Sequence, residues 1–125
     1  MVLERADRLG VSVCGSLLAE LGATVLQVGG AAFDIGLTGT AQGRAVTLGR
    51  LGKIRVEEAA SGAAWLSLVA RADVVLLGDL RPEDHALLAR ERDCRVVCAL
   101  SAFGADAPPG ASPAGETAAQ AAGGL

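Results

Sequence analysis

The stretch VCGSLLAELGATVLQV, residues 13–28, decides the fold, because it joins a helix pattern directly to a strand pattern. Its apolar residues recur at helical spacing as far as Leu21, and Ser12 just before it is a suitable N-cap. Gly22 follows where a helix favours a left-handed residue at its C-terminus. TVLQV, residues 24–28, is then a short apolar strand. Helix, glycine and strand in this order form half of a βαβ unit.

A second helix and a buried strand follow further along the chain. VVLL, Val74–Leu77, is apolar throughout, which is typical of a strand buried on both faces of a sheet. We expect the helix before it over Ser61–Arg71, with large apolar residues on or near its buried face: Trp65, Leu66, Leu68 and Val69. Residues 29–53 are punctuated by glycines, so we expect a loop there with a brief strand at Ala45–Leu48.

The remaining elements extend the alternation of strands and helices. We expect strands at Val2–Glu4, Ile54–Val56 and Arg95–Leu100, a helix that begins at Pro82, and a helix over Glu116–Ala122. This alternation predicts an α/β fold: a Rossmann-like, three-layer parallel sheet with helices on both faces, in a single domain over residues 1–125. Val74–Leu77 and Arg95–Leu100 are then neighbouring central strands.

Composition and charge exclude several classes of protein. Hydrophobic residues make up 51% of the chain, so enough apolar surface exists to offset the entropy of folding. The net charge of −3 and the lack of any run of Lys or Arg argue against nucleic acid as a partner. No uninterrupted apolar run approaches the roughly 18–20 residues that cross a bilayer, and no signal-peptide pattern opens the chain. We therefore expect a soluble, cytoplasmic protein with no membrane partner.

Metal-binding and catalytic patterns are missing from the sequence. Cys94 and Cys98 flank two valines of an expected strand, and with Cys14 and the single His85 they do not have the spacing of zinc ligands. We expect buried, reduced thiols and no metal. The carboxylates of Glu57 and its neighbour point in different directions, and His85 has no orienting partner in the pattern, so neither indicates acid–base catalysis.

The start of the first helix is a weak candidate for anion binding. Gly10 and Gly15 form G-x-x-x-x-G, but no Lys-Ser or Lys-Thr follows, and the dinucleotide pattern G-x-G-x-x-G is missing as well. A helix N-terminus still presents free N–H groups to a phosphate. Two interpretations stay open on the residues alone: a ligand phosphate at this helix start, or ordinary helix packing.

Four stretches of the chain together resemble the family III CoA-transferases, which include formyl-CoA:oxalate transferases, carnitine-CoA transferases and α-methylacyl-CoA racemases. VCGSLLAELGATVLQV is similar to that family's C-G-x-L-L-A-D-L-G-A-x-V-I-K-V, and LVARADVVLLGDLRP, residues 68–82, to L-V-x-x-A-D-V-L-I-E-N-F-R-P. RVVCALSAFG, residues 95–104, is similar to R-L-I-Y-C-S-I-S-G-F-G, and PAGETAAQAAGGL, residues 113–125, to P-G-Y-D-L-x-x-Q-A-x-G-G-L. The order and rough spacing of the four agree over nearly the whole chain.

The resemblance implies the N-terminal, CoA-binding part of an enzyme that transfers CoA from an acyl-CoA to a carboxylate. In that family CoA lies across the carboxyl edge of the sheet, two subunits interlock as rings, and an aspartate further along accepts the acyl group. The chain stops at Leu125, before the position of that aspartate, so we expect no catalytic residue here. The implied partners are acyl-CoA and either a second subunit or the rest of a longer protein.

The departures from the family patterns fall in the expected loops, where ligand contacts belong. Gly10-Val11-Ser12 stands in place of A-G-P, and Gly78-Asp79-Leu80-Arg81-Pro82 in place of E-N-F-R-P. The resemblance assigns CoA contacts to Gly10, Val11, Ser12, Lys53, Asp79, Leu80 and Arg81, with Lys53 and Arg81 as charge partners of the phosphates.

Two other functions remain open beside CoA transfer. The first is a non-catalytic scaffold or dimerisation domain of the same fold with an eroded CoA site, which the altered loops favour. The second is a generic nucleotide-binding module, which the missing dinucleotide pattern disfavours. Racemase activity is also disfavoured, because Gly115 stands where that branch of the family has a histidine.

Overall fold

The computed structural model describes residues 1–29, 39–57, 61–78, 80–81, 84, 96–103, 120–121 and 124. The helix expected from Pro82 and most of the one expected at Glu116–Ala122 lie outside these residues, as do Asp79, His85 and Cys94.

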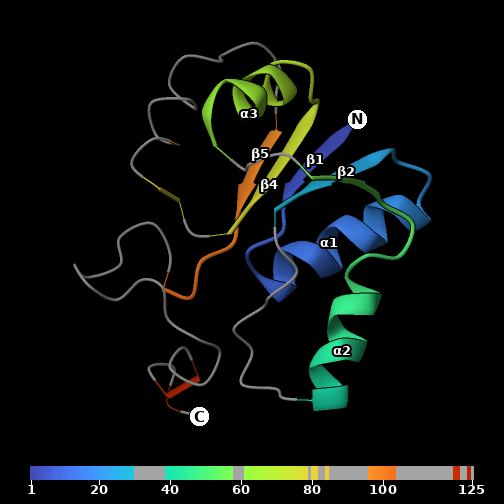
Figure 1. Ribbon diagram of the computed structural model, residues 1–125. Coiled ribbons are helices and arrows are strands. Elements are labelled where there is room, and N and C mark those ends of the chain that lie inside the picture. The colour runs from blue at the N-terminus through green and yellow to red at the C-terminus, as the bar shows by residue number, and fades with distance from the viewer. Residues whose placement is uncertain are drawn as a thin grey trace.

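The described elements form a five-stranded parallel sheet with helices on both faces (Figure 1). Along the chain they are β1 (Val2–Arg5), α1 (Leu9–Glu20), β2 (Val25–Val28), α2 (Gly39–Leu48), β3 (Ile54–Val56), α3 (Gly62–Val69), β4 (Val74–Leu77) and β5 (Val96–Ala99). The strand order is β3-β2-β1-β4-β5, and every pair of neighbours is parallel. The predicted Rossmann-like α/β fold is therefore confirmed.

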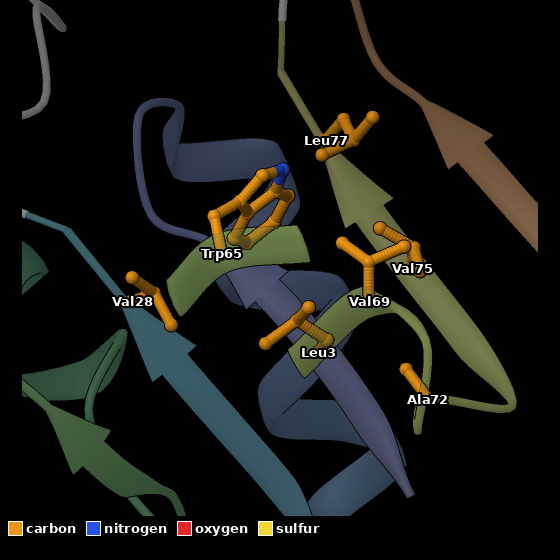
Figure 2. Packing of buried hydrophobic residues seen from close by; sticks show 7 residues of the cluster. All are labelled: Leu3, Val28, Trp65, Val69, Ala72, Val75 and Leu77. Carbon is orange, nitrogen blue, oxygen red and sulfur yellow. The ribbon is translucent and has the colours of Figure 1, made fainter. Parts of the chain in front are cut away.

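Two apolar clusters hold the helices onto the sheet, one on each face. On the face of the sheet covered by α3, which we call the α3 face, Trp65 and Val69 of α3 are buried against the strands, as Figure 2 shows. The cluster on this face consists of Leu3, Val28, Trp65, Val69, Ala72, Val75 and Leu77. The α1 face is built from Val2, Val11, Val25 and Leu76, with Cys14 and Leu18 packed beside them. Successive residues of a strand point to opposite faces, so an unbroken apolar strand such as β4 serves both clusters.

Helix α1 begins earlier than its sequence pattern predicts. Arg8 occupies the N-cap position without a side-chain cap, and the helix runs from Leu9. Ser12 is fully buried within α1, so the predicted N-cap at Ser12 is wrong. Its hydroxyl donates a hydrogen bond to Glu4 at 2.8 Å, and this tertiary partner takes the place of a cap. At the other end Gly22 has φ +92°, which confirms the left-handed residue expected there.

The expected strand at Ala45–Leu48 is wrong, because these residues belong to helix α2. Local β propensity in this segment is overridden by topology: the parallel strands β2 and β3 need a crossover connection, and such connections are usually helical. The predicted strand Ile54–Val56 is confirmed as β3.

The predicted pairing of Val74–Leu77 with the strand after it is confirmed, with a difference in position. β4 and β5 are parallel neighbours in the register Val74↔Val96 to Leu77↔Ala99. β5 lies at the edge of the described sheet, so it is not a central strand. In α3, Trp65 and Val69 are buried as expected, whereas Leu66 is about half exposed and lies off the buried face.

Candidate functional site at the carboxyl edge of the sheet

The carboxyl ends of β1 and β4 form the topological switch point of the sheet. The chain proceeds from β1 toward β2 and β3 on one side, and from β4 to β5 on the other. In open α/β sheets ligands bind in the crevice outside such a point. The loop after β1 here leads into the N-terminus of α1, and the loop after β4 carries Gly78, Leu80 and Arg81.

The two loops touch at Gly78 and Asp7. A Cβ atom added to Gly78 would lie 2.2 Å from Oδ1 of Asp7 and 2.9 Å from Cγ of Arg8. Only a residue without a side chain fits at this close approach. The carboxyl edge at the switch point is thus closely packed on the side of Asp7.

A buried arginine ties this edge together on the α3 face. The guanidinium of Arg5 donates two parallel hydrogen bonds to Asp84, each 2.9 Å long, and a third of 2.9 Å to Oδ2 of Asp7. Oδ2 of Asp84 also accepts the backbone N–H of Arg81 at 2.8 Å. The Arg5 guanidinium lies 5.9 Å from the centre of the Trp65 ring, within the range of a cation–π interaction.

The protonation of Arg5 is secured by these partners. Burial lowers the pKa of the guanidinium, but the hydrogen bond to Asp84 and the negative charges of Asp7 and Asp84 outweigh it, so the pKa is raised. Arg5 is therefore a permanent buried cation that joins the loop after β1 to the loop after β4. We call Arg5, Asp7 and Asp84 the Arg5 network.

One oxygen of the Arg5 network is left over. Oδ1 of Asp7 is buried and has no hydrogen-bond partner among the described residues. A buried carboxylate oxygen without a donor is costly, because it has lost water and gained nothing in return. Because this oxygen is buried, a ligand reaches it only if the packing against Gly78 opens. A phosphate does not suit the position, because its charge has the same sign.

A second buried polar group lies on the α1 face, around Glu4. Oε1 of Glu4 accepts hydrogen bonds from Ser12 Oγ and Gln27 Nε2, both at 2.8 Å, and Oε2 accepts one from Lys53 Nζ at 2.6 Å. Lys53 also donates to the backbone oxygen of Ser12 at 2.6 Å, and Gln27 donates to the backbone oxygen of Gly49 at 2.8 Å. We call Glu4, Ser12, Gln27 and Lys53 the Glu4 cluster.

The Glu4 cluster is closed to solvent. The side chains of Glu4 and Lys53 have no exposed surface. Gly15 of α1 lies directly over the carboxylate, because a Cβ atom there would fall 1.9 Å from Glu4 Oε2. A satisfied ion pair in this position fastens β1, α1 and the segment before β3 to one another.

The residues assigned to CoA contact are divided between the edge and the interior. Gly10 is exposed in the first turn of α1, and Arg81 is partly exposed beside Asp84. Leu80 packs on the apolar cluster of the α3 face. Val11 and Ser12 are fully buried on the α1 face. Lys53 forms an ion pair with Glu4, so its expected contact with a phosphate requires that ion pair to open.

Comparison with protein-family models, with curated proteins and with solved structures found no match. The fold and the geometry of the edge are therefore what the chain itself offers for a functional assignment.

Sequence reasoning missed the two charged residues at the end of β1. Glu4 and Arg5 are adjacent in a buried strand, so their side chains point to opposite faces and each needs a separate partner. Two adjacent charged residues in an otherwise apolar strand are the sequence signal for buried ion pairs, because charged residues are almost never fully buried unless they are paired. The identity of the partners was not readable, since Lys53 and Asp84 lie 49 and 79 residues away along the chain.

The cysteines contribute little to the site. Cys14 and Cys98 are free thiols, and burial raises the pKa of Cys14, with Cys98 and Glu4 acting in the same direction. Within the described residues there is no group of three or more metal-ligating side chains. No helix among them has the length and apolar character to cross a bilayer.

Proposed function

We propose that this chain is the CoA-binding N-terminal domain of a family III CoA-transferase, which in the full-length enzyme transfers CoA from an acyl-CoA to a carboxylate. One observation carries the proposal. The strand order β3-β2-β1-β4-β5 has its switch point at the carboxyl ends of β1 and β4, next to two segments to which the resemblance assigns CoA contacts: the start of α1 with Gly10, and the loop with Leu80 and Arg81.

The exposed part of this edge suits the phosphates of CoA. Helix α1 is twelve residues long and begins at Leu9 without a side-chain cap, and Gly10 in its first turn is exposed. Free N–H groups and the helix dipole favour an anion there. Arg81 supplies a partly exposed cation on the neighbouring loop, held in place by the bond from its N–H to Asp84.

The buried part of the edge suits a different portion of the ligand. Oδ1 of Asp7, which has no partner among the described residues, would meet a hydroxyl or amide of CoA only if its close contact with Gly78 opens. In this proposal the chain binds and orients CoA, which brings the reactive thiol. The acyl-accepting carboxylate belongs to the remainder of the enzyme.

The alternative is a non-catalytic scaffold or dimerisation domain of the same fold. The Glu4 cluster favours it, because Ser12 and Lys53, two residues assigned to CoA contact, are fully engaged inside the protein. An edge that has lost these two contacts binds CoA weakly or not at all.

Calorimetric titration of CoA separates the two functions. We expect binding with a dissociation constant in the millimolar range or tighter, and a loss of about tenfold or more in Arg81→Ala, as is typical of a charge-assisted contact. Arg71→Ala is the matched control, because Arg71 is exposed just before the amino end of β4, at the edge of the sheet opposite Arg81. No heat of binding with the wild-type chain, or an equal loss in both variants, supports the scaffold.

A further inference from the structure

Two of the three cysteines of the chain lie on the same face of the sheet, although they are far apart in the sequence. Cys14 belongs to α1 and Cys98 to β5, and both are half-buried free thiols. Both side chains pack against the apolar cluster of the α1 face. The third cysteine, Cys94, lies outside the described residues. Helix α1 and strand β5 therefore present one thiol each to a common part of the core.

The start of α1 touches the chain just after β5. A Cβ atom added to Gly10 would lie 3.4 Å from Cδ2 of Leu100, which is ordinary van der Waals contact. The N–H of Leu100 in turn donates to the backbone oxygen of Leu77 at 2.9 Å, so this residue continues the line of β5. Helix α1 connects the parallel strands β1 and β2 and therefore runs in the opposite direction to every strand of the sheet.

Similar steps from this contact lead to the two thiols. One helical turn from Gly10, about 6 Å along α1, leads to Cys14. Two residues back from Leu100, about 7 Å along β5, lead to Cys98, on the same face of the strand. Burial raises the pKa of Cys14, and the charge of Cys98 adds to the rise, so the two sulfur atoms lie within electrostatic reach. Cys14 and Cys98 therefore face each other between α1 and β5.

We propose that Cys14 and Cys98 form a reversible disulfide that joins α1 to β5. The oxidant is a low-molecular-weight disulfide such as oxidised glutathione. One cysteine thiolate attacks a sulfur of this reagent and releases a first reduced thiol, and the other cysteine then attacks the mixed disulfide and releases the second. The pair gives up two electrons, its two protons end on the released thiols, and the S–S bond of the reagent is replaced by the bond between Cys14 and Cys98.

The disulfide and the fold should stabilise each other. A bond between α1 and β5 closes a long loop of chain, and such a bond stabilises a protein mainly by restricting its unfolded state. Oxidation should therefore raise the melting temperature by about 5 °C or more, and a reducing agent should reverse the shift. Because the coupling is reciprocal, the equilibrium constant for oxidation should be at least about tenfold larger in the folded chain than in urea.

Mass spectrometry in a glutathione redox buffer tests the pair. Cys94→Ser provides the background, because it leaves only Cys14 and Cys98. This variant should lose the mass of two hydrogen atoms, stay a single chain and carry no bound glutathione. The matched control adds Cys14→Ser, so that Cys98 has no second thiol to attack its mixed disulfide. That control should keep bound glutathione and show no reversible rise in melting temperature.

Three results would overturn the proposal: reduced thiols or bound glutathione in place of the disulfide in Cys94→Ser, a disulfide only between two chains, or an equilibrium constant as large in urea as in the folded protein. Circular dichroism verifies that the variants fold, and Cys98→Ser replaces Cys14→Ser if the latter does not. The exchange with glutathione requires no CoA, so titration of CoA into the reduced chain tests the proposed function separately.

Discussion

Glu4 and Arg5 are neighbours in β1, yet their surroundings differ in one decisive respect. The Glu4 cluster on the α1 face satisfies both carboxylate oxygens and has no exposed surface on its ion pair. The Arg5 network on the α3 face joins two loops of the carboxyl edge and leaves Oδ1 of Asp7 without a donor among the described residues. A fully satisfied group of charges fastens elements together, whereas a network with an unsatisfied buried oxygen at a switch point gains a hydrogen bond if the edge rearranges around a ligand. Variants in and around the two groups of charges test this difference.

The largest effect is expected from removing the cation of the Glu4 cluster. Lys53→Met leaves Glu4 buried without its charge partner and should reduce the free energy of unfolding by about 3–5 kcal/mol, measured by urea denaturation. The double variant Glu4→Gln with Lys53→Met should recover much of that loss, because no unpaired charge remains. Equal losses in the single and the double variant would mean that the ion pair is not what holds these elements.

Breaking the Arg5 network at Asp84 should cost less, because Asp7 remains beside the cation. Asp84→Asn weakens the paired hydrogen bonds to Arg5 and should lower the free energy of unfolding by about 2–3 kcal/mol. It also loosens the loop that carries Arg81, so CoA affinity should fall in the same variant. Thermal unfolding and calorimetry measure the two effects. An unchanged CoA affinity in Asp84→Asn would mean that the Arg5 network does not position the CoA-binding loop.

The close approach at Gly78 is the next test. Gly78→Ala places a Cβ atom against Oδ1 of Asp7 and should destabilise the fold by about 1–3 kcal/mol. Gly43→Ala is the control, because a Cβ at Gly43 meets nothing within 4 Å and lies inside helix α2, where alanine should stabilise by about 0.5–1 kcal/mol. Opposite signs in the two variants are expected in chemical denaturation.

The smallest effect concerns Cys14, next to the Glu4 cluster. Burial raises the pKa of its thiol, with Cys98 and Glu4 adding to the rise and Lys53 opposing it. The protonated thiol favours the folded state. This contribution to stability is fully present below the pKa of the thiol in the unfolded chain, about 8.5, and is lost as the pH rises through the higher pKa of the folded protein. Stability should therefore fall more steeply with rising pH above about pH 8 in the wild type than in Cys14→Ala. An equal slope in the two proteins would contradict the raised pKa.

The fold was predictable from the sequence where pattern and topology agree. Val74–Leu77 is apolar at all four positions and is a strand at the same four positions, and Gly22 ends α1 in the left-handed conformation. The helical state of Ala45–Leu48 was not predictable from its residues, because it follows from the need to connect two parallel strands. Helix α1 also starts three residues before Ser12, whose hydroxyl prefers a partner across the core.

The candidate site was predictable only in part. The order of the resembling motifs located the start of α1 at Gly10 and the loop with Leu80 and Arg81, and both lie at the carboxyl edge of the sheet. The roles of Ser12 and Lys53 could not be read, because the side chain that engages both is Glu4, which is far from Lys53 in the sequence. Local patterns report which elements form. They do not report which charges meet in the interior.

The register of β1 has a consequence for how the protein emerges during synthesis. Val2 pairs with Val25 on one side and with Val74 on the other, so the second neighbour of the central strand lies 72 residues downstream. At about 5–20 residues per second, a ribosome takes roughly 4–14 s to extend the chain that far. During those seconds β1 has no β4 to pair with along one of its edges. Long-range parallel pairing is itself slow. A chaperone that shields nascent apolar segments would therefore have β1 as a target during this time.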